Sequence, residues 1–377
     1  MDKVFVENMP KLGFGLMRLP KLEDGVHIDI EYTSRMVDLF LEAGMKYFDT
    51  AYVYDGGLSE EAARAALVER HPRDSFYLAT KLNVTAQGCV DEATAKKQLE
   101  ISLQRTGAGY FDFYLLHALS ADRLAANEKY HLWEFVKEMK EKGRIRHYGF
   151  SFHDKPEILD QILTEHPDVE FVQLQINYAD WESFNVQSRA CLEVARKHGK
   201  PVVVMEPVKG GTLAAPPEKI AQLLREANSS ASPASWAIRF AASQEGILTV
   251  LSGMSNLEQM EDNLSYMKTF QPLNEEENAV LKEAMKVLTQ IRQIPCTSCH
   301  YCTPGCPMEI PIPEIFSSLN LDLIYGQREN AVRQYSWHTG NKSKASACIQ
   351  CGQCESVCPQ HIEIISWLEE CARTLEK

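Results

Sequence analysis

Two runs of four cysteines near the end of the chain repeat one spacing, C-x-x-C-x-x-C-x-x-x-C-P. The first run contains Cys296, Cys299, Cys302 and Cys306, and the second contains Cys348, Cys351, Cys354 and Cys358. This spacing is typical of two [4Fe–4S] clusters, because three thiolates at i, i+3 and i+6 surround one cube and the fourth ligates the other cube. The expected ligand sets are therefore crossed: Cys296, Cys299, Cys302 and Cys358 for cluster 1, and Cys348, Cys351, Cys354 and Cys306 for cluster 2.

Zinc is the first competing interpretation, because paired C-x-x-C units also form four-cysteine zinc sites. A zinc ion needs only four ligands, however, and such a site uses neither the i+6 cysteine nor the proline that follows each run. The spacing therefore favours iron–sulfur clusters. We expect Cys89, Cys191 and Cys371 to be packing residues, since free cysteine behaves mainly as a small apolar side chain.

The start of the chain, MDKVFVENMP, has neither a basic segment nor an apolar segment of the kind found in a secretory signal. No run approaches the roughly 18 apolar residues that would suggest a membrane span. We therefore expect a cytoplasmic protein without disulfides and without a membrane partner.

The net charge is −13, with 52 acidic against 39 basic residues. A polyanion would be repelled by this charge, so nucleic acid is not an expected partner.

Before the cysteine runs, short β-rich segments alternate with amphipathic helical segments. The strand-like segments are LGFGLMRL, KYFDTA, FYLATKL, FDFYLLHA, IRHYGFSF, FVQLQIN, PVVVMEPV and ILTVLSG. Several helical segments between them end at a glycine typical of a C-cap, namely Gly44, Gly107, Gly143 and Gly199. This pattern predicts an α/β fold made of β/α units, and eight units in this length are typical of a closed (β/α)8 TIM barrel.

An open doubly wound sheet is the structural alternative. It is disfavoured because no G-x-G-x-x-G follows the first strand, and Gly13-Phe14-Gly15 lies within a strand pattern. The segment LNEEENAVLKEAMKVLTQIRQI reads as a helix that leads into the tail. We expect a barrel domain over residues 1–285 and a small, mainly α-helical ferredoxin-like domain over residues 286–377.

Polar side chains lie at the ends of successive strands, which is where the active-site residues of a closed (β/α)8 barrel are found. They are Asp49 and the nearby Tyr54, then Lys81, His117, Ser151, Gln175, Asn177, Glu206 and Ser252. A lysine cation beside a tyrosine lowers the pKa of the phenol, and an aspartate keeps the lysine charged and in place. This combination indicates proton transfer, with His117 orienting or polarising a carbonyl group.

Taken singly, Asp49 would be interpreted as a cap, His117 as a core histidine and Lys81 as a surface group. Their joint placement at strand ends favours a site. The segments FDTAYVYDGGLSE, ATKLN, YLLHAL, GFSFH, QLQINY, MEPVKGG and LSGMSNLEQMEDN resemble the aldo-keto reductase family in order and spacing. The tail resembles the helical dicluster ferredoxin domain that is fused to one bacterial and archaeal branch of that family.

The resemblance implies roles for the matching positions. Tyr54 would be the general acid that acts on a small-molecule carbonyl substrate, with Lys81 and Asp49 tuning its pKa and His117 orienting the substrate. The expected contacts of an NADPH or NADH cofactor are Ser151, Gln175, Met205, Glu206, Ser252, Gly253, Ser255, Gln259 and Asn263. Ser255-Asn256-Leu257-Glu258 also reads as a capping box whose free backbone N–H groups would meet an anion.

Several positions depart from the family pattern. Phe152 and His153 follow Ser151, where the family usually has asparagine, and Met205 stands where an aromatic ring often stacks on the nicotinamide. Gly253 and Gln259 occupy positions that carry basic residues for a 2′-phosphate in many members. Lys209 and Arg239 are candidates to supply that charge from elsewhere. NADPH is still favoured over NADH.

The segment between the cysteine runs has a helical pattern, and its aromatic residues are expected to pack around the clusters: Tyr325, Tyr335 and Trp337. Three functions remain open. In the first hypothesis, the protein is a carbonyl reductase that uses NAD(P)H, and its clusters are structural or exchange electrons with a ferredoxin- or flavodoxin-like partner. Alternatively, a ferredoxin-like donor feeds the barrel through the clusters and a flavin or other switch. The third hypothesis is a non-catalytic redox sensor or docking protein.

Overall fold

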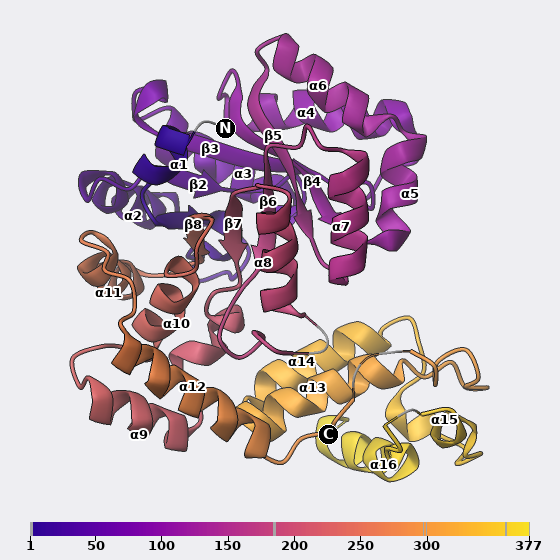
Figure 1. Cartoon of the computed structure of the whole chain (residues 1–377). Helices are drawn as coiled ribbons and strands as arrows, with labels where there is room; N and C mark the ends of the chain where they lie inside the picture. Colours follow the sequence, from indigo (N-terminus) through magenta and orange to yellow (C-terminus); the bar gives the residue numbers. More distant parts are fainter. Residues whose placement is uncertain (1–2, 184–185, 297, 299, 359, 377) are drawn as a thin grey trace. The chain divides into compact units, whose positions relative to one another are not determined.

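The computed structural model describes the whole chain except residues 1–2, 184–185, 297, 299, 359 and 377. The chain divides into two compact units (Figure 1). The first comprises Met1–Gly210 and Ala234–Glu275, and the second comprises Gly211–Pro233 and Glu276–Lys377. The contacts thus group residues 211–233 with the tail, so the units are interleaved in sequence, and the domain division at residue 285 stays a prediction.

The first unit is built on a closed barrel of eight parallel strands in sequence order. The strands are β1 Leu12–Gly15, β2 Tyr47–Asp49, β3 Tyr77–Leu82, β4 Phe111–Leu119, β5 Ile145–Phe152, β6 Phe171–Gln175, β7 Val202–Met205 and β8 Ile247–Ser252. The barrel closes where β1 pairs with β8, with Phe14 opposite Ser252. The predicted (β/α)8 barrel is therefore confirmed, and the open doubly wound alternative is wrong.

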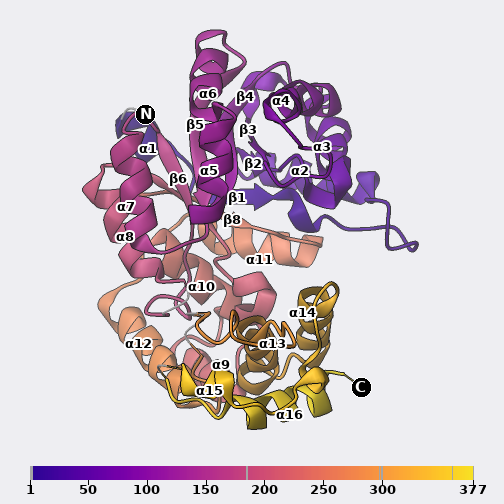
Figure 2. The ribbon, with the colours of Figure 1, turned by 90° about the vertical axis from the view of Figure 1, so that its right-hand side faces the viewer.

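Helices surround these strands in the first unit (Figures 1 and 2). They are α1 Lys3–Asn8, α2 Ile30–Glu42, α3 Leu58–Ala63, α4 Glu92–Thr106, α5 Ala121–Lys129, α6 Leu132–Glu141, α7 Pro156–Glu165, α8 Ser188–Lys197, α10 Pro233–Ala242 and α11 Leu257–Met267. The C-terminal capping glycines predicted for several of these helices are confirmed. Gly44, Gly107, Gly143 and Gly199 all have positive φ, from 65° to 84°.

Helix α1 packs against one end of the barrel core. Its Phe5 ring lies 5.5 Å from the Tyr77 ring and 6.3 Å from the Phe113 ring, centroid to centroid. Tyr77 begins β3, so α1 lies at the end of the barrel where the strands start. The strand ends that carry the polar residues lie at the opposite end, which leaves that end for the site.

The second unit is helical. It contains α9 Glu218–Ala227, α12 Glu275–Gln290, α13 Ile312–Tyr325, α14 Arg328–Thr339, α15 Gln353–Ser356 and α16 Ile364–Leu375. Its apolar core includes Ile315, Phe316 and Leu319 of α13 together with Leu368 of α16. Figure 2 shows α13 and α14 side by side. The helical pattern expected between the cysteine runs is thus confirmed as α13 and α14.

The aromatic residues of this unit behave differently from one another. Tyr335 is 2% exposed, and its hydroxyl donates to Glu376 at 2.5 Å and accepts from the backbone N–H of Ala345 at 2.8 Å. Trp337 is 78% exposed, so the expectation that it packs around the clusters is wrong. Helix α14 places Tyr335 on its buried face and Trp337, two positions later, on its exposed face.

None of the helices in the described part of the chain is long and apolar enough to span a membrane.

Candidate active site and cluster cavities

Lys81 is the centre of the polar group at the barrel mouth. It lies one residue before the end of β3 and is 1% exposed. Its Nζ donates hydrogen bonds to Asp49 Oδ1 and, at 2.7 Å, to the backbone oxygen of Thr50. The same Nζ lies 3.2 Å from the Tyr54 hydroxyl oxygen. Strands β2 and β3 pair in register, with Asp49 opposite Ala79, and this pairing brings the aspartate beside the lysine. The structure therefore brings together the three residues expected to transfer a proton.

The electrostatics of these residues differ from the sequence-based expectation in one respect. Burial raises the pKa of Tyr54 above its ordinary value, and the nearby Lys81 cation offsets this only partly. The expected lowering of the phenol pKa by Lys81 is therefore present, but the larger effect of burial leaves the pKa of Tyr54 above its ordinary value. Burial lowers the pKa of Lys81, but the interactions of its ammonium group with Asp49 and Tyr54 outweigh burial, so the pKa of Lys81 is raised. At neutral pH the site holds a protonated tyrosine beside a lysine cation.

His117 lies against this group near the end of β4. Its ring stands edge-on to the Tyr54 ring, with centroids 5.8 Å apart and planes at 76°. Burial, and then the positive charges of Lys81, His153 and Arg123, hold the pKa of His117 well below its ordinary value. The imidazole is therefore neutral at physiological pH. Asn83, which sequence reasoning missed, places its amide nitrogen 3.4 Å from His117 Nδ1.

The expected carboxamide-binding residues lie at the ends of neighbouring strands. Ser151 Oγ accepts a hydrogen bond from the backbone N–H of Ala118 at 2.7 Å, so its hydroxyl proton is still available to a ligand. Gln175 Nε2 donates to Asp180 Oδ2 at 2.9 Å. Strands β5 and β6 pair with Ser151 opposite Gln173, which brings both expected residues to one side of the mouth.

A buried network around Asp180 was also missed. Asp180 is 4% exposed, accepts from Asn177 Nδ2 at 2.8 Å, and pairs with Lys209 Nζ at 2.6 Å. Lys209 is therefore engaged with a carboxylate and is not the free cation expected for a 2′-phosphate. A second Asn177 hydrogen bond, to the backbone oxygen of Glu206 at 3.1 Å, fixes the end of β7. The available signal was the run of polar residues just after the sixth strand.

The loop after β8 differs from the expected capping box by one position. Asn256, and not Ser255, is the N-cap of α11, because its side chain accepts from the backbone N–H of Gln259 at 2.8 Å. Gln259 Oε1 in turn accepts from the backbone N–H of Ser255 at 2.8 Å. Both N–H groups are thus occupied within the chain. Asn263 is 4% exposed and donates to Ser252 Oγ at 2.8 Å, which ties the helix to the strand end.

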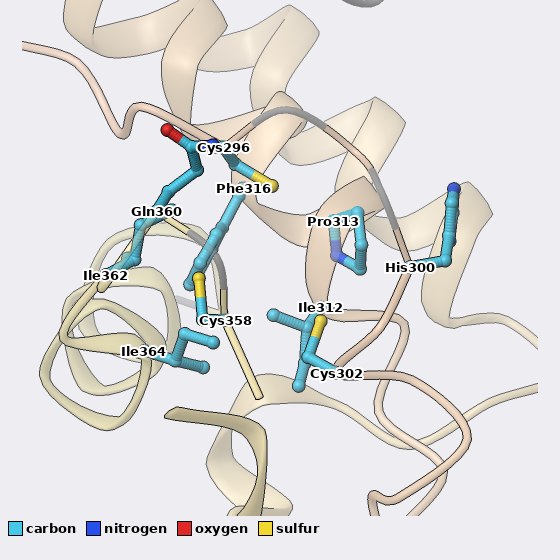
Figure 3. A pocket seen from close by; sticks show the side chains of 10 residues that line it. All are labelled: Cys296, His300, Cys302, Ile312, Pro313, Phe316, Cys358, Gln360, Ile362 and Ile364. Carbon is cyan, nitrogen blue, oxygen red and sulfur yellow. The ribbon is translucent and has the colours of Figure 1, made fainter. Parts of the chain in front are cut away.

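In the second unit, cysteines from both runs line one small cavity. Cys296 and Cys302 come from the first run and Cys358 comes from the second (Figure 3). The other lining residues include Ile312, Phe316, Ile362 and Ile364. The fourth expected ligand, Cys299, lies outside the described residues. Cys302 is 7% exposed, so this cavity sets a thiol group in mainly apolar surroundings.

A second small cavity is lined by the other expected set. It contains Cys306 of the first run with Cys348, Cys351 and Cys354 of the second. Among the described residues, no three His, Cys, Asp or Glu side chains converge as the ligands of a single metal ion would. Among the described cysteines, those outside both cavities are Cys89, Cys191 and Cys371. Burial raises the pKa of both Cys191 and Cys371 to about 12.

The first unit thus combines a closed barrel with a buried ionic group at the carboxyl ends of its strands. The chain belongs to the aldo/keto reductase family, whose model matches residues 11–286. A 4Fe-4S dicluster domain matches residues 295–363. The resemblance of both parts that was inferred from the sequence is therefore confirmed.

Among curated relatives, an aldo-keto reductase of Mycolicibacterium smegmatis is 30% identical over 158 residues, which are 42% of this chain and 51% of that protein. An aldo-keto reductase of a Mycobacterium species is 33% identical over 38% of this chain and 44% of its own length. The chain thus spans about half the length of these relatives. An uncharacterised oxidoreductase of Bacillus subtilis is 24% identical over 67% of this chain and 87% of that protein.

Solved structures show the same barrel. An aldo-keto reductase of Bacillus halodurans in its holo form has 27% identity and a TM-score of 0.57, and the match covers 72% of this chain and 91% of that one. An aldo-keto reductase of Klebsiella pneumoniae in complex with NADPH has 20% identity and a TM-score of 0.59, over 74% and 91% of the two chains. The second likeness shows the fold alone.

Proposed function

We propose that the barrel reduces the carbonyl group of a small molecule to an alcohol, or catalyses the reverse reaction, with a nicotinamide cofactor, most readily NADPH. The observation that carries this proposal is the position of Lys81 Nζ, which lies between Asp49 and the Tyr54 hydroxyl. Such an arrangement holds a proton at the Tyr54 oxygen and stabilises the phenolate once the proton has left. It is the arrangement of a general acid.

Each residue then has a separate task. Tyr54 donates its proton to the oxygen of the carbonyl group, and Lys81 stabilises the phenolate that remains. Asp49 keeps Lys81 charged and in place, while the neutral His117 donates a hydrogen bond that orients the carbonyl oxygen. When bound, the nicotinamide supplies the hydride that reduces the carbonyl carbon.

The residues at the mouth fit such a cofactor. The free hydroxyl proton of Ser151 and the amide of Gln175 provide hydrogen-bonding groups for a carboxamide, and Met205 offers an apolar surface nearby. Gly253 stands beside Arg18, whose Cδ would lie 3.8 Å from a Cβ atom at that position. We infer that Arg18 is a cation available near the phosphates, since Lys209 is paired with Asp180.

Tyr54→Phe tests the proposed acid. We expect turnover to fall by about 10² to 10⁴, because a general acid contributes this much, while cofactor affinity is retained. Tyr52→Phe is the matched control, since Tyr52 lies in the same loop but its ring stacks on Arg105, with the guanidinium carbon 4.5 Å from the ring centroid. Full activity of Tyr54→Phe on every reducible carbonyl would exclude the proposed mechanism.

We also propose that each of the two cavities of the second unit holds one [4Fe–4S] cluster on crossed ligands. The supporting observation is that each cavity combines cysteines of both runs, which the spacing rule requires. The apolar lining fits a cluster, because it excludes water from the sulfur atoms. Clusters of this kind, when bound, supply one-electron redox chemistry. Their role here is structural or is an exchange of electrons with a ferredoxin- or flavodoxin-like partner.

Metal analysis of anaerobically prepared protein tests this second proposal. About eight iron atoms per chain are expected for two four-iron clusters, and stoichiometric zinc would contradict it. Cys371→Ser is a matched control, because Cys371 is fully buried in the same unit but lines neither cavity.

Thiolate ligands of this kind persist in a reducing compartment, so we propose that the protein works in the cytoplasm.

A further inference from the structure

Asn83 is held rigidly beside the active site. It follows the end of β3, is 8% exposed, and its backbone N–H donates to Gln98 Oε1 at 2.9 Å. Gln98 Nε2 returns a hydrogen bond to the backbone oxygen of Asn83, also at 2.9 Å. Gln98 belongs to α4 and is itself 1% exposed. The backbone of Asn83 is therefore fixed by a buried side chain from a neighbouring element.

The orientation of the Asn83 amide follows from its neighbours. The backbone N–H of Thr85 lies 2.8 Å from Oδ1, and the Thr85 hydroxyl lies 2.7 Å from the same atom. A backbone N–H can only donate, so the atom that it meets must be the amide oxygen. The amide nitrogen, Nδ2, therefore faces His117, where it lies 3.4 Å from Nδ1.

This contact selects one form of the imidazole. Nδ2 carries two hydrogens and cannot accept, so the hydrogen bond forms only when His117 Nδ1 is unprotonated. In the other neutral tautomer, two donors would face each other at this distance. Because the imidazole is neutral at physiological pH, its single proton lies on Nε2. Among the residues that the structure describes, none forms a hydrogen bond with Nε2, so this atom is open to a ligand.

We propose that Asn83 is a positioning residue that fixes the Nε2–H tautomer of His117, so that the neutral imidazole donates a hydrogen bond to the substrate carbonyl. The catalytic consequence rests on the proposed function, whereas the tautomer itself does not. Asn83 acts through His117 and touches no reacting atom. The 3.4 Å separation is long for a hydrogen bond, and such bonds commonly shorten when an active site closes around its substrate.

Asn83→Asp is the sharpest perturbation. The aspartate keeps one oxygen in the place of Oδ1, which preserves both hydrogen bonds from Thr85. Its second oxygen replaces the donor that faces His117 with an anionic acceptor. The Nδ1-protonated tautomer and the imidazolium both become favoured, and the pKa of His117 rises toward the accessible range. Thr85→Val is the matched control, since the backbone N–H that orients the Asn83 amide remains.

Nitrogen NMR of protein with ¹⁵N-labelled histidine measures the tautomer directly, because protonated and unprotonated ring nitrogens have different chemical shifts. His117→Gln assigns the signals among the 11 histidines. The expected result is an Nε2–H imidazole in the wild type and in Thr85→Val, and loss of that form in Asn83→Asp. An Nδ1–H imidazole in the wild type, or an unchanged tautomer in Asn83→Asp, would overturn the proposal.

The pH profile provides a second measurement. The other titratable or charged groups near His117 are Lys81, Arg123, His153 and Tyr54. At neutral pH, Asn83→Asp should lower kcat/KM by about 10²- to 10³-fold, because one donor to the developing oxyanion is lost. Activity should then rise as the pH falls, since the imidazolium again carries a proton on Nε2. The wild type and Thr85→Val should lack this rise.

The two measurements separate the possible failures. If the NMR result holds but the wild type reduces no carbonyl, the proposed function fails and the assignment of the tautomer stands. If reduction occurs but Asn83→Asp keeps the wild-type tautomer and pH profile, the proposed function stands and the role of Asn83 is excluded.

Discussion

Lys81→Met should destabilise the barrel as well as inactivate it. Lys81 and Asp49 are 1% and 3% exposed, and the substitution removes the cation that compensates the buried carboxylate. Methionine has nearly the same length and no branch, so the main change is the loss of charge and of hydrogen bonds to Asp49, Thr50 and Tyr54. Removing one partner of a buried ion pair costs about 3–5 kcal/mol of the free energy of unfolding.

This cost corresponds to a fall of roughly 6–20 °C in the Tm of the barrel transition, given about 2–4 °C per kcal/mol for a unit of this size. Lys142→Met is the matched control. Lys142 pairs with Glu138 on the surface, where the two side chains are 58% and 55% exposed. An exposed pair contributes about 1 kcal/mol or less, so its loss should hardly change the Tm.

The destabilisation of Lys81→Met should depend on pH. Burial already raises the pKa of Asp49 in the folded protein, and loss of the Lys81 charge raises it further. A carboxyl group whose pKa is higher in the folded than in the unfolded state favours folding at low pH, and this contribution is lost as the pH rises toward the folded pKa. The Tm difference between variant and wild type should therefore be smaller at about pH 5 than at about pH 8.

Differential scanning calorimetry at both pH values measures these differences. In the double variant Asp49→Asn/Lys81→Met no buried charge is left unpaired, so we expect it to recover most of the lost Tm without recovering activity. The reasoning is refuted if Lys81→Met matches the Tm of the wild type, or if the double variant is no more stable than the single one.

Further predictions concern the clusters and the barrel wall. Cys306→Ser should damage the cluster bound by Cys348, Cys351 and Cys354 and spare the cluster of its sequence neighbours, as electron paramagnetic resonance of the reduced protein would reveal; loss of the Cys302 cluster instead would contradict crossed ligation. Replacing both Cys302 and Cys354 by serine should keep NADPH-dependent reduction near the wild-type rate and abolish any activity driven by reduced ferredoxin; full ferredoxin-driven activity would show that the clusters do not feed the barrel. Gly149→Ala should lower the free energy of unfolding by about 1–3 kcal/mol, because its Cβ would lie 2.3 Å from the backbone oxygen of Phe171, and an unchanged urea midpoint would contradict this close contact.

The sequence by itself determined the features that local patterns encode. The strand segments from LGFGLMRL to ILTVLSG became the eight parallel strands of a closed barrel. The helix stops at Gly44, Gly107, Gly143 and Gly199 followed from the left-handed backbone that only glycine adopts readily. The helical pattern between the cysteine runs similarly became α13 and α14. These features were predictable because they depend on residues close together in the chain.

Sequence reasoning also placed Asp49, Lys81 and Tyr54 together, since the strands of a barrel end at one mouth. It did not find Asn83 beside His117 or Asp180 beside Lys209. Both contacts join residues about 30 positions apart, and they depend on how the loops after the strands pack. No local pattern encodes the direction of an amide side chain.

Only the tertiary structure decided the electrostatic balance of the site. A lysine beside a tyrosine predicted a lowered phenol pKa, yet burial outweighs that cation and raises the pKa of Tyr54. The tertiary structure was also needed to show that Asn256 is the N-cap of α11 and that the Trp337 ring is exposed. Desolvation depends on every atom that surrounds a group, whereas a motif records only the residue types that are present.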